Sequence, residues 1–326
     1  MEEHAPRQPS HRHSGSAGFP LRSRAFRRIR AILVALCAAA LAVTLAAGVH
    51  SAQAGSTAAV QSGGQPAGQS PASGSESVAP AAALPAATPA AGAVDSELDA
   101  EINAIIDANP EYQLGVALLD LSDGADASQQ VHEYGVDEAF VAASTAKVLA
   151  AEAYYHLVET GRASLDDPLG AYTAEFHLQA MIQQSDNDSW SLIMDAVGHK
   201  ELTDYAAAMG VDYAPTSNTL TPAEMARILA GLYNGTLLDP GNTAQLLGYM
   251  QDTNYETLIP AAVPAGITVF HKYGLLGGEL HDAGILAKDG RAYALVIYTK
   301  GDDLSSVPER TDVIRQVTAA VADALF

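Results

Sequence analysis

The chain has 326 residues, enough for one large domain or two small ones, and its 17 Lys and Arg against 38 Asp and Glu give a net charge of −21. Residues 1–50 hold seven Arg and two Glu, so the remainder carries ten basic and 36 acidic residues, a balance of −26. That acidity excludes nucleic acid as a partner, and the single cysteine, Cys37, excludes disulfide scaffolds and cysteine nucleophiles from the rest of the chain.

An uncharged stretch at 31–49 follows the basic segment 1–30. Its 19 residues, at about 1.5 Å each, just span the roughly 30 Å hydrocarbon core of a bilayer. The preceding arginines predict that 1–30 stays in the cytoplasm and that everything after residue 50 is exported. The stretch is either a membrane anchor or a signal sequence cleaved near Ala54, and both interpretations make the body extracytoplasmic.

Residues 50–95 consist largely of Ala, Gly, Ser, Pro, Gln and Thr without apolar periodicity. Such a segment buries too little surface to offset its ordering entropy, which predicts a flexible linker. The folded domain is therefore expected over 96–326, and it is long enough for one enzyme core.

The first part of this domain alternates between helical and strand-like patterns. Leu98, Ile102, Ile105 and Ile106 have the spacing of an amphipathic helix, which Pro110 ends. Further segments are predicted in chain order: strands at 112–121 and 129–134, a helix at 144–161, and more helices up to about residue 251.

The C-terminal part is strand-like again. The predicted elements are strands at 267–274, 280–288 and 291–299, then a helix at 308–325. The last two strands are joined by a turn at Asp289-Gly290. Strands at both ends with helices between them predict an α+β fold: an antiparallel sheet, flanked by N- and C-terminal helices, beside an all-helical lobe.

A candidate nucleophile opens the helix predicted at 144–161. A serine at a helix N-terminus has its hydroxyl where backbone N–H groups converge, as a developing oxyanion requires. Lys147 follows Ser144 by three residues, so it returns to the same face and could take the hydroxyl proton if its pKa is depressed. Taken alone, the pair also fits an N-cap serine with an exposed lysine.

Two further short motifs follow. Ser185-Asp186-Asn187 lies between helical segments, where it could face a cleft or simply cap the next helix. Lys272-Tyr273-Gly274 ends the strand predicted at 267–274. In this order the three motifs are the set used by class A β-lactamases and penicillin-binding proteins. Over about 97–326, the sequence resembles the class A β-lactamase family and its penicillin-recognising serine-hydrolase relatives.

The resemblance implies a role for each matching residue. Ser144 would be the acylated nucleophile, Lys147 its proton acceptor, and Ser185 a proton relay to the leaving nitrogen. Substrate binding would fall to the residues Asn187, Lys272, Tyr273, Gly274, Leu275 and His281. Among these, Lys272 would supply positive charge for a substrate carboxylate, and the N–H groups of Ser144 and Leu275 would form the oxyanion hole.

The sequence also departs from this family. The segment 209–221 contains no Glu and is shorter than the family's Ω-loop, whose Glu activates the deacylating water; Asp212 is its only acid. Tyr273 replaces the usual Thr or Ser, and His281-Asp282 stands near the place of the usual arginine. Either His271 or His281 could be a cleft residue or a structural one.

These features predict an exported serine hydrolase that is acylated on Ser144 by β-lactams or by cell-wall peptide-like amides or esters, and that deacylates slowly. The open alternatives are a β-lactamase with an atypical base, a non-catalytic β-lactam or muropeptide sensor, and a tethered spacer with relic motifs. No metal cluster or cofactor motif is visible, so no cofactor is expected. The expected partners are the small substrate and, through 31–49, the membrane.

Overall fold

A computed structural model describes residues 94–122 and 130–326 of the chain. All of them belong to one unit, Ala82–Phe326. The predicted basic segment 1–30, the apolar segment 31–49 and nearly all of the linker 50–95 lie outside the described residues. Within the described ranges, no helix combines the length and apolar character needed to cross a membrane.

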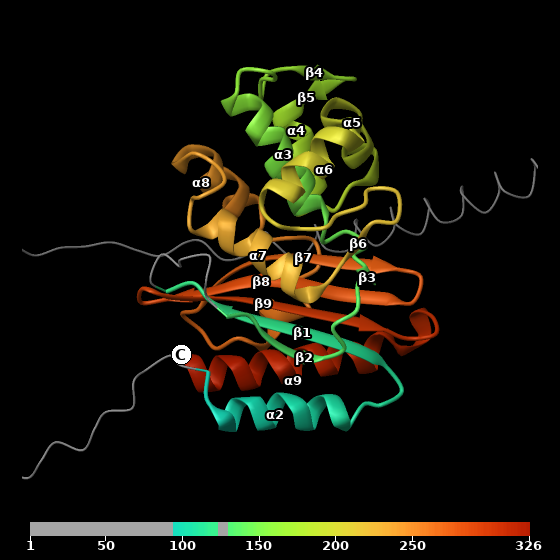
Figure 1. Ribbon diagram of the computed structural model, residues 1–326, viewed down its shortest axis with the longest axis vertical. Coiled ribbons are helices and arrows are strands. Elements are labelled where there is room, and N and C mark those ends of the chain that lie inside the picture. The colour runs from blue at the N-terminus through green and yellow to red at the C-terminus, as the bar shows by residue number, and fades with distance from the viewer. Residues whose placement is uncertain (1–93, 123–129) are drawn as a thin grey trace, which may run out of the picture. The chain divides into compact units, whose positions relative to one another are not determined.

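The centre of the fold is a five-stranded antiparallel sheet in the order β2-β1-β9-β8-β7 (Figure 1). The strands are β1 Gln113–Asp120, β2 His132–Gly135, β7 Thr268–Leu276, β8 Glu279–Lys288 and β9 Arg291–Lys300. The predicted α+β class is confirmed, and the strands follow one another along the chain as predicted. Strands β8 and β9 are buried along nearly their whole length, because both faces of the sheet are covered.

Helices α2 (Ser96–Asp107) and α9 (Val307–Leu325) cover one face of the sheet, as Figure 1 shows. Leu98 and Ile102 of α2 pack with Ile314 and Val317 of α9 in one apolar cluster. These are the N- and C-terminal helices that the hydrophobic spacing predicts. The side chain of Asp95 caps α2 by accepting from two backbone N–H groups.

The helical lobe lies on the other face of the sheet (Figure 1). Its helices are α3 Lys147–Glu159, α4 Ala174–Gln183, α5 Asn187–Val197, α6 His199–Ala208, α7 Pro222–Tyr233 and α8 Pro240–Tyr249. Four two-residue strands accompany these helices: β3 Phe140–Val141 before α3, and β4 Pro168–Leu169, β5 Tyr172–Thr173 and β6 Thr219–Leu220 between later helices. The lobe shares one apolar core with the inner residues of the sheet.

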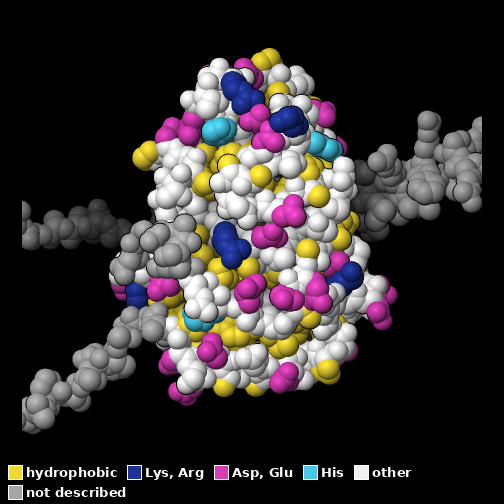
Figure 2. Space-filling model, viewed as in Figure 1, with side chains coloured by type: hydrophobic (Ala, Val, Ile, Leu, Met, Phe, Trp, Pro, Cys, Tyr) yellow, Lys and Arg dark blue, Asp and Glu magenta, His cyan; other side chains and the backbone are white. Residues whose placement is uncertain are grey.

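The predicted turn between β8 and β9 is confirmed. Asp289 and Gly290 have φ of 52° and 81°, the left-handed pair that a two-residue hairpin requires. The acidic composition is visible on the surface. Asp and Glu side chains are spread over the viewed face, on the helical lobe as well as on the part that contains the sheet (Figure 2).

Candidate active site

The candidate nucleophile, Ser144, lies in a turn between β3 and α3. The helix begins at Lys147, three residues later than predicted. The preceding turn is held by hydrogen bonds between residues three apart in the chain, such as Thr145 N–H to Ala142 O (3.1 Å), before α-helical hydrogen bonding starts. Ala143 has φ 50°, a left-handed conformation that costs energy for a residue with a Cβ and must be held by its surroundings.

Asn218 holds this turn, and the sequence analysis missed it. Its backbone oxygen accepts from Ala142 N–H (2.7 Å), and its side-chain amide donates to Ala143 O (3.0 Å). The phenol of Tyr213 donates to the Asn218 side-chain oxygen (2.9 Å). The only available signal was an asparagine in a loop, the residue type that tolerates the left-handed φ of 51° found here.

Lys147 is buried at the N-terminus of α3, with its Nζ directed to the loop between α4 and α5. The Nζ donates to Ser185 O (2.7 Å) and Asn187 Oδ1 (2.7 Å), and it lies 3.3 Å from Ser185 Oγ. Burial lowers the pKa of Lys147 to about 8, and nearby Asp186 opposes this shift. The neutral form of Lys147 is therefore far more accessible near neutral pH than that of an ordinary lysine.

Neutral Lys147 has the hydrogen-bonding capacity of a base. A neutral amine has two N–H donors and one lone pair. The two short contacts take the donors, which leaves the lone pair free to accept a proton. The motif analysis predicted such a lysine. The hydrogen bonds of the described residues, however, join it to Ser185 and Asn187 rather than to the Ser144 hydroxyl.

The motif 185–187 caps the next helix, as one of the two interpretations of the sequence predicted, and also directs a hydroxyl at Lys147 and Lys272. Asp186 caps α5, because its carboxylate accepts from Ser189 N–H (2.6 Å). Ser185, with φ 54°, makes the sharp turn between α4 and α5 and presents its hydroxyl to the two lysines. Asn187 is exposed and keeps its amide NH₂ available, since its oxygen accepts from Lys147.

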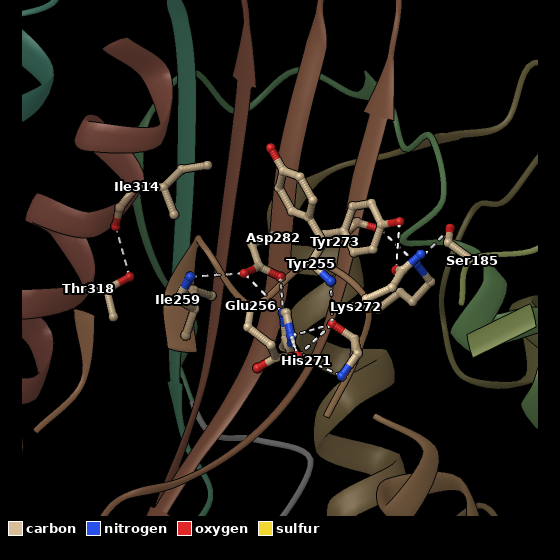
Figure 3. A network of polar contacts seen from close by, with 12 residues as sticks. Ser185, Tyr255, Glu256, Ile259, His271, Lys272, Tyr273, Asp282, Ile314 and Thr318 are labelled. Carbon is tan, nitrogen blue, oxygen red and sulfur yellow. Dashed lines mark hydrogen bonds and ion pairs between the residues drawn. The ribbon is translucent and has the colours of Figure 1, made fainter. Parts of the chain in front are cut away.

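Lys272 reaches the same hydroxyl from strand β7 (Figure 3). Its Nζ donates to Ser185 Oγ (2.9 Å) and Tyr273 O (2.9 Å), and it lies 4.1 Å from the centre of the Tyr273 ring. Burial and the charge of Lys147 hold the pKa of Lys272 well below its usual range, although Asp282 opposes this. The expected positive charge at Lys272 is therefore disfavoured.

Gly274 brings strand β7 against the nucleophile turn. A Cβ at this position would lie 3.1 Å from Ala142 O and 3.2 Å from Ser144 N. Strand β7 is the edge of the sheet, and alternate residues direct their backbone groups outward. The outward N–H of His271 donates to Met250 O, and the outward carbonyl of Tyr273 accepts from the Lys272 side chain. Leu275 follows in this alternation, so its N–H faces the same open edge as Ser144.

His281 is apart from this group. Its side chain is fully buried, stacked on Tyr298 at 4.2 Å, and its Nε2 lies 3.0 Å from Val141 O. The Nδ1 accepts from Thr299 N–H (3.1 Å). Burial lowers the pKa of His281 to about 4, so the ring is neutral. This geometry supports the structural interpretation of His281 over the substrate-binding one, because the ring has no exposed atom to offer.

His271 forms a buried ionic network behind Lys272 (Figure 3). Its Nδ1 lies 2.9 Å from Asp282 Oδ1, and its Nε2 lies 3.1 Å from Glu256 Oε1 and 3.0 Å from the Thr253 hydroxyl. Burial alone would lower the pKa of His271, but the Asp282 carboxylate and then Glu256 outweigh it and raise the pKa to about 9. The ring is thus an imidazolium that ties β7 to the loop 251–258.

The same loop also connects strand β7 to Ser185. The Asn254 side chain donates to Gln184 O (3.0 Å) and accepts from the Tyr273 phenol (3.0 Å). Asn254 and Glu256 were not identified from the sequence, because no short motif marks them. Loop 251–258 therefore fixes the spacing between two of the predicted site segments.

The described residues place no carboxylate in hydrogen-bonding contact with Ser144, Lys147 or Ser185. Asp212 is exposed, and its backbone N–H donates to Glu224 (3.0 Å). Glu224 itself closes the capping box of α7 by accepting from Thr221 N–H (2.8 Å). No group of three or more His, Cys, Asp and Glu among these residues is arranged to hold a metal ion.

A serine at a left-handed turn, two buried lysines around a second serine, and an edge strand with outward N–H groups form a site for acyl transfer. This fold and site define a serine hydrolase of the β-lactamase and penicillin-binding type. A family model described as "Beta-lactamase enzyme family" matches residues 97–325. The chain belongs to this family.

Individual β-lactamases and penicillin-binding proteins are similar to this chain in sequence or structure. Beta-lactamase CTX-M-8 from Citrobacter amalonaticus is 27% identical over 248 residues, which cover 65% of this chain and 84% of that protein. Beta-lactamase CTX-M-25 from Escherichia coli is 28% identical over the same length. A PBP-A mutant, solved as an acyl-enzyme complex with penicillin G, superimposes with a TM-score of 0.63 and 26% identity, covering 70% of this chain and 96% of that one.

Proposed function

We propose that the protein is acylated on Ser144 by β-lactams or by cell-wall peptide-like amides or esters, and that it releases the acyl group slowly. The carrying observation is the pair of buried lysines around the Ser185 hydroxyl, one of them with a pKa of about 8. A protein that only binds its ligand gains nothing from a desolvated amine behind a serine.

During acylation, a proton would pass from Ser144 to the leaving atom by way of Lys147 and Ser185. The Ser144 oxygen forms a bond to the acyl carbon while its proton passes to neutral Lys147. The bond from the acyl carbon to the leaving nitrogen or oxygen breaks. Ser185 gives its hydroxyl proton to the leaving atom and regains one from Lys147, which ends neutral. The N–H groups of Ser144 and Leu275 stabilise the oxyanion.

Slow release follows from the missing acid. Hydrolysis of the acyl-enzyme requires a base that activates water. The shortened loop 209–221 offers only the exposed Asp212, and Glu224 is bound to backbone N–H groups. The similar mutant of PBP-A was solved as an acyl-enzyme complex with penicillin G, which supports acylation by this class of compound.

The basic segment 1–30 and apolar segment 31–49 support an extracytoplasmic location, with 31–49 as an anchor or as a signal cleaved near Ala54. Residues 50–95 would then tether the domain 96–326 within reach of cell-wall material.

Two chromogenic probes test the acylation proposal on the full chain: a cephalosporin and a p-nitrophenyl ester, each with Ser144→Ala as control. We expect a burst of one product per enzyme, absent in the control, then a steady rate far below the roughly 1–1,000 per second usual for enzymes. Sustained turnover in that range would overturn slow release. No burst and no consumption with either probe would overturn acyl transfer.

A further inference from the structure

The hydrogen bonds of Lys272 go to groups of the protein itself. Its Nζ donates to Ser185 Oγ and Tyr273 O, both at 2.9 Å, and lies 4.1 Å from the centre of the Tyr273 ring. A neutral amine has only two N–H groups, and these two contacts take both. The whole residue is fully buried. A carboxylate approaching Lys272 therefore finds no free donor without displacing one of these partners.

The polar groups of Tyr273 and His281 are also committed elsewhere. The Tyr273 hydroxyl donates to Asn254 (3.0 Å). His281, which pairs with Gly274 across the sheet, is fully buried with both ring nitrogens bound to backbone groups. The low pKa of Lys272 agrees with this geometry, because burial and Lys147 both disfavour its charged form.

The rim of the site is apolar along strand β7. Strand β7 continues past Gly274 with Leu275 and Leu276, which are 38% and 56% exposed. Before Gly274, the rings of Tyr273 and Tyr255 pack at 4.8 Å. Exposed apolar side chains that adjoin a reactive group suit an apolar substituent.

From these contacts we infer that the acyl donor is a neutral ester or amide that has an apolar group, and no carboxylate, next to the scissile bond. The inference rests on the proposed function, since it names the substrate class of the same site. The reaction is unchanged: the Ser144 oxygen bonds to the acyl carbon, its proton passes to Lys147, and the bond to the leaving atom breaks as Ser185 gives that atom a proton, so that a neutral alcohol or amine departs.

A matched pair of acyl donors tests this on the full chain. Benzylpenicillin carries a carboxylate near its β-lactam nitrogen, and its methyl ester carries a neutral apolar group there. We measure the second-order rate of adduct formation on Ser144 by intact mass and divide each rate by that of opening in hydroxide. We expect the corrected acylation rate of the acid to be no greater than that of the ester, a ratio of about one or less. If the carboxylate made a charge-assisted hydrogen bond worth about 1.5–3 kcal/mol, the acid would instead react about tenfold faster or more.

Two variants of Tyr273 complete the test. Tyr273→Thr removes the ring that covers Lys272, and we expect it to shift the ratio toward the acid at least tenfold. Tyr273→Phe keeps the ring and loses only the bond to Asn254, so its ratio should match that of the parent. An acid-to-ester ratio above ten in the parent, or an unchanged ratio in Tyr273→Thr, would overturn the inference and leave the proposed function standing. No adduct with either donor would instead overturn the proposed function.

Discussion

The two buried histidines on adjacent strands predict opposite responses to pH. His271 lies between Asp282 and Glu256 as an imidazolium, and its side chain is 1% exposed. His281, on β8, is neutral and bonded to backbone groups. Replacing His271 and its fully buried partner together, as His271→Gln/Asp282→Asn, removes both charges and leaves two amides that can still hydrogen bond.

The size of the effect follows from the pKa of His271. A pKa raised from 6.5 to about 9, at about 1.4 kcal/mol for each tenfold change in proton affinity, corresponds to about 3 kcal/mol. Because the folded state holds the proton more tightly, this stability is fully present below pH 6.5 and is lost as the pH rises through about 9. The buried position makes screening by solvent small.

Urea denaturation of the full chain from pH 6 to pH 10 measures the difference between parent and double variant at each pH. We expect that difference to fall by about 3 kcal/mol across the range. The matched control, His281→Gln, should show a constant difference above about pH 8, where His281 is neutral in both the folded and the unfolded state. A flat profile for the double variant would refute the charged state of His271.

Three further predictions concern single side chains. Lys147→Met should slow acylation about 10²–10⁴-fold, the usual contribution of a general base, whereas Lys200→Met, at an exposed position, should leave the rate unchanged. In the parent, the acylation rate should rise with pH up to about 8, because Lys147 loses its proton over that range. Asn218→Ala should lower the free energy of unfolding by about 2 kcal/mol and slow acylation, because the turn loses its side-chain hydrogen bond. Asn218→Gly should relieve the backbone strain but leave acylation slow. An acylation rate equal to that of the parent in Asn218→Gly would show that the turn needs no support from this side chain. Glu152 is fully buried and has no hydrogen-bond partner among the described residues, and burial raises its pKa well above the usual range. Glu152→Met should therefore raise the free energy of unfolding at pH 8 by at least about 1 kcal/mol, a gain that thermal or urea unfolding would detect and that should shrink toward pH 4.

Patterns of local origin were predictable from the sequence. The spacing of Leu98 and Ile102 identified α2, and Asp289-Gly290 identified the β8–β9 hairpin. The three motifs predicted that Ser144, Ser185 and Lys272 form one site, and the structure brings the elements that carry them together, while their roles in acyl transfer stay predictions. Each of these signals is contained in a few neighbouring residues, which explains why sequence alone was sufficient.

Features that depend on contacts between distant segments were not predictable. Lys147 was expected to contact Ser144, but its donors point to a loop about forty residues away. His281 could not be separated from a cleft residue until its contacts to Val141 and Thr299 were known. The charge of His271 arises from Asp282 and Glu256, whose approach depends on how loop 251–258 packs.

The central claim is that Ser144 forms a long-lived acyl-enzyme. Intact mass spectrometry of the full chain after incubation with benzylpenicillin and, separately, its methyl ester tests it most directly, with Ser144→Ala as control. Because the leaving nitrogen of a β-lactam stays attached to the acyl group, the predicted result is a gain of one whole probe molecule that persists for hours and is absent in the control. A probe that is consumed without an adduct, or an unmodified and inactive protein with both probes, would contradict the account.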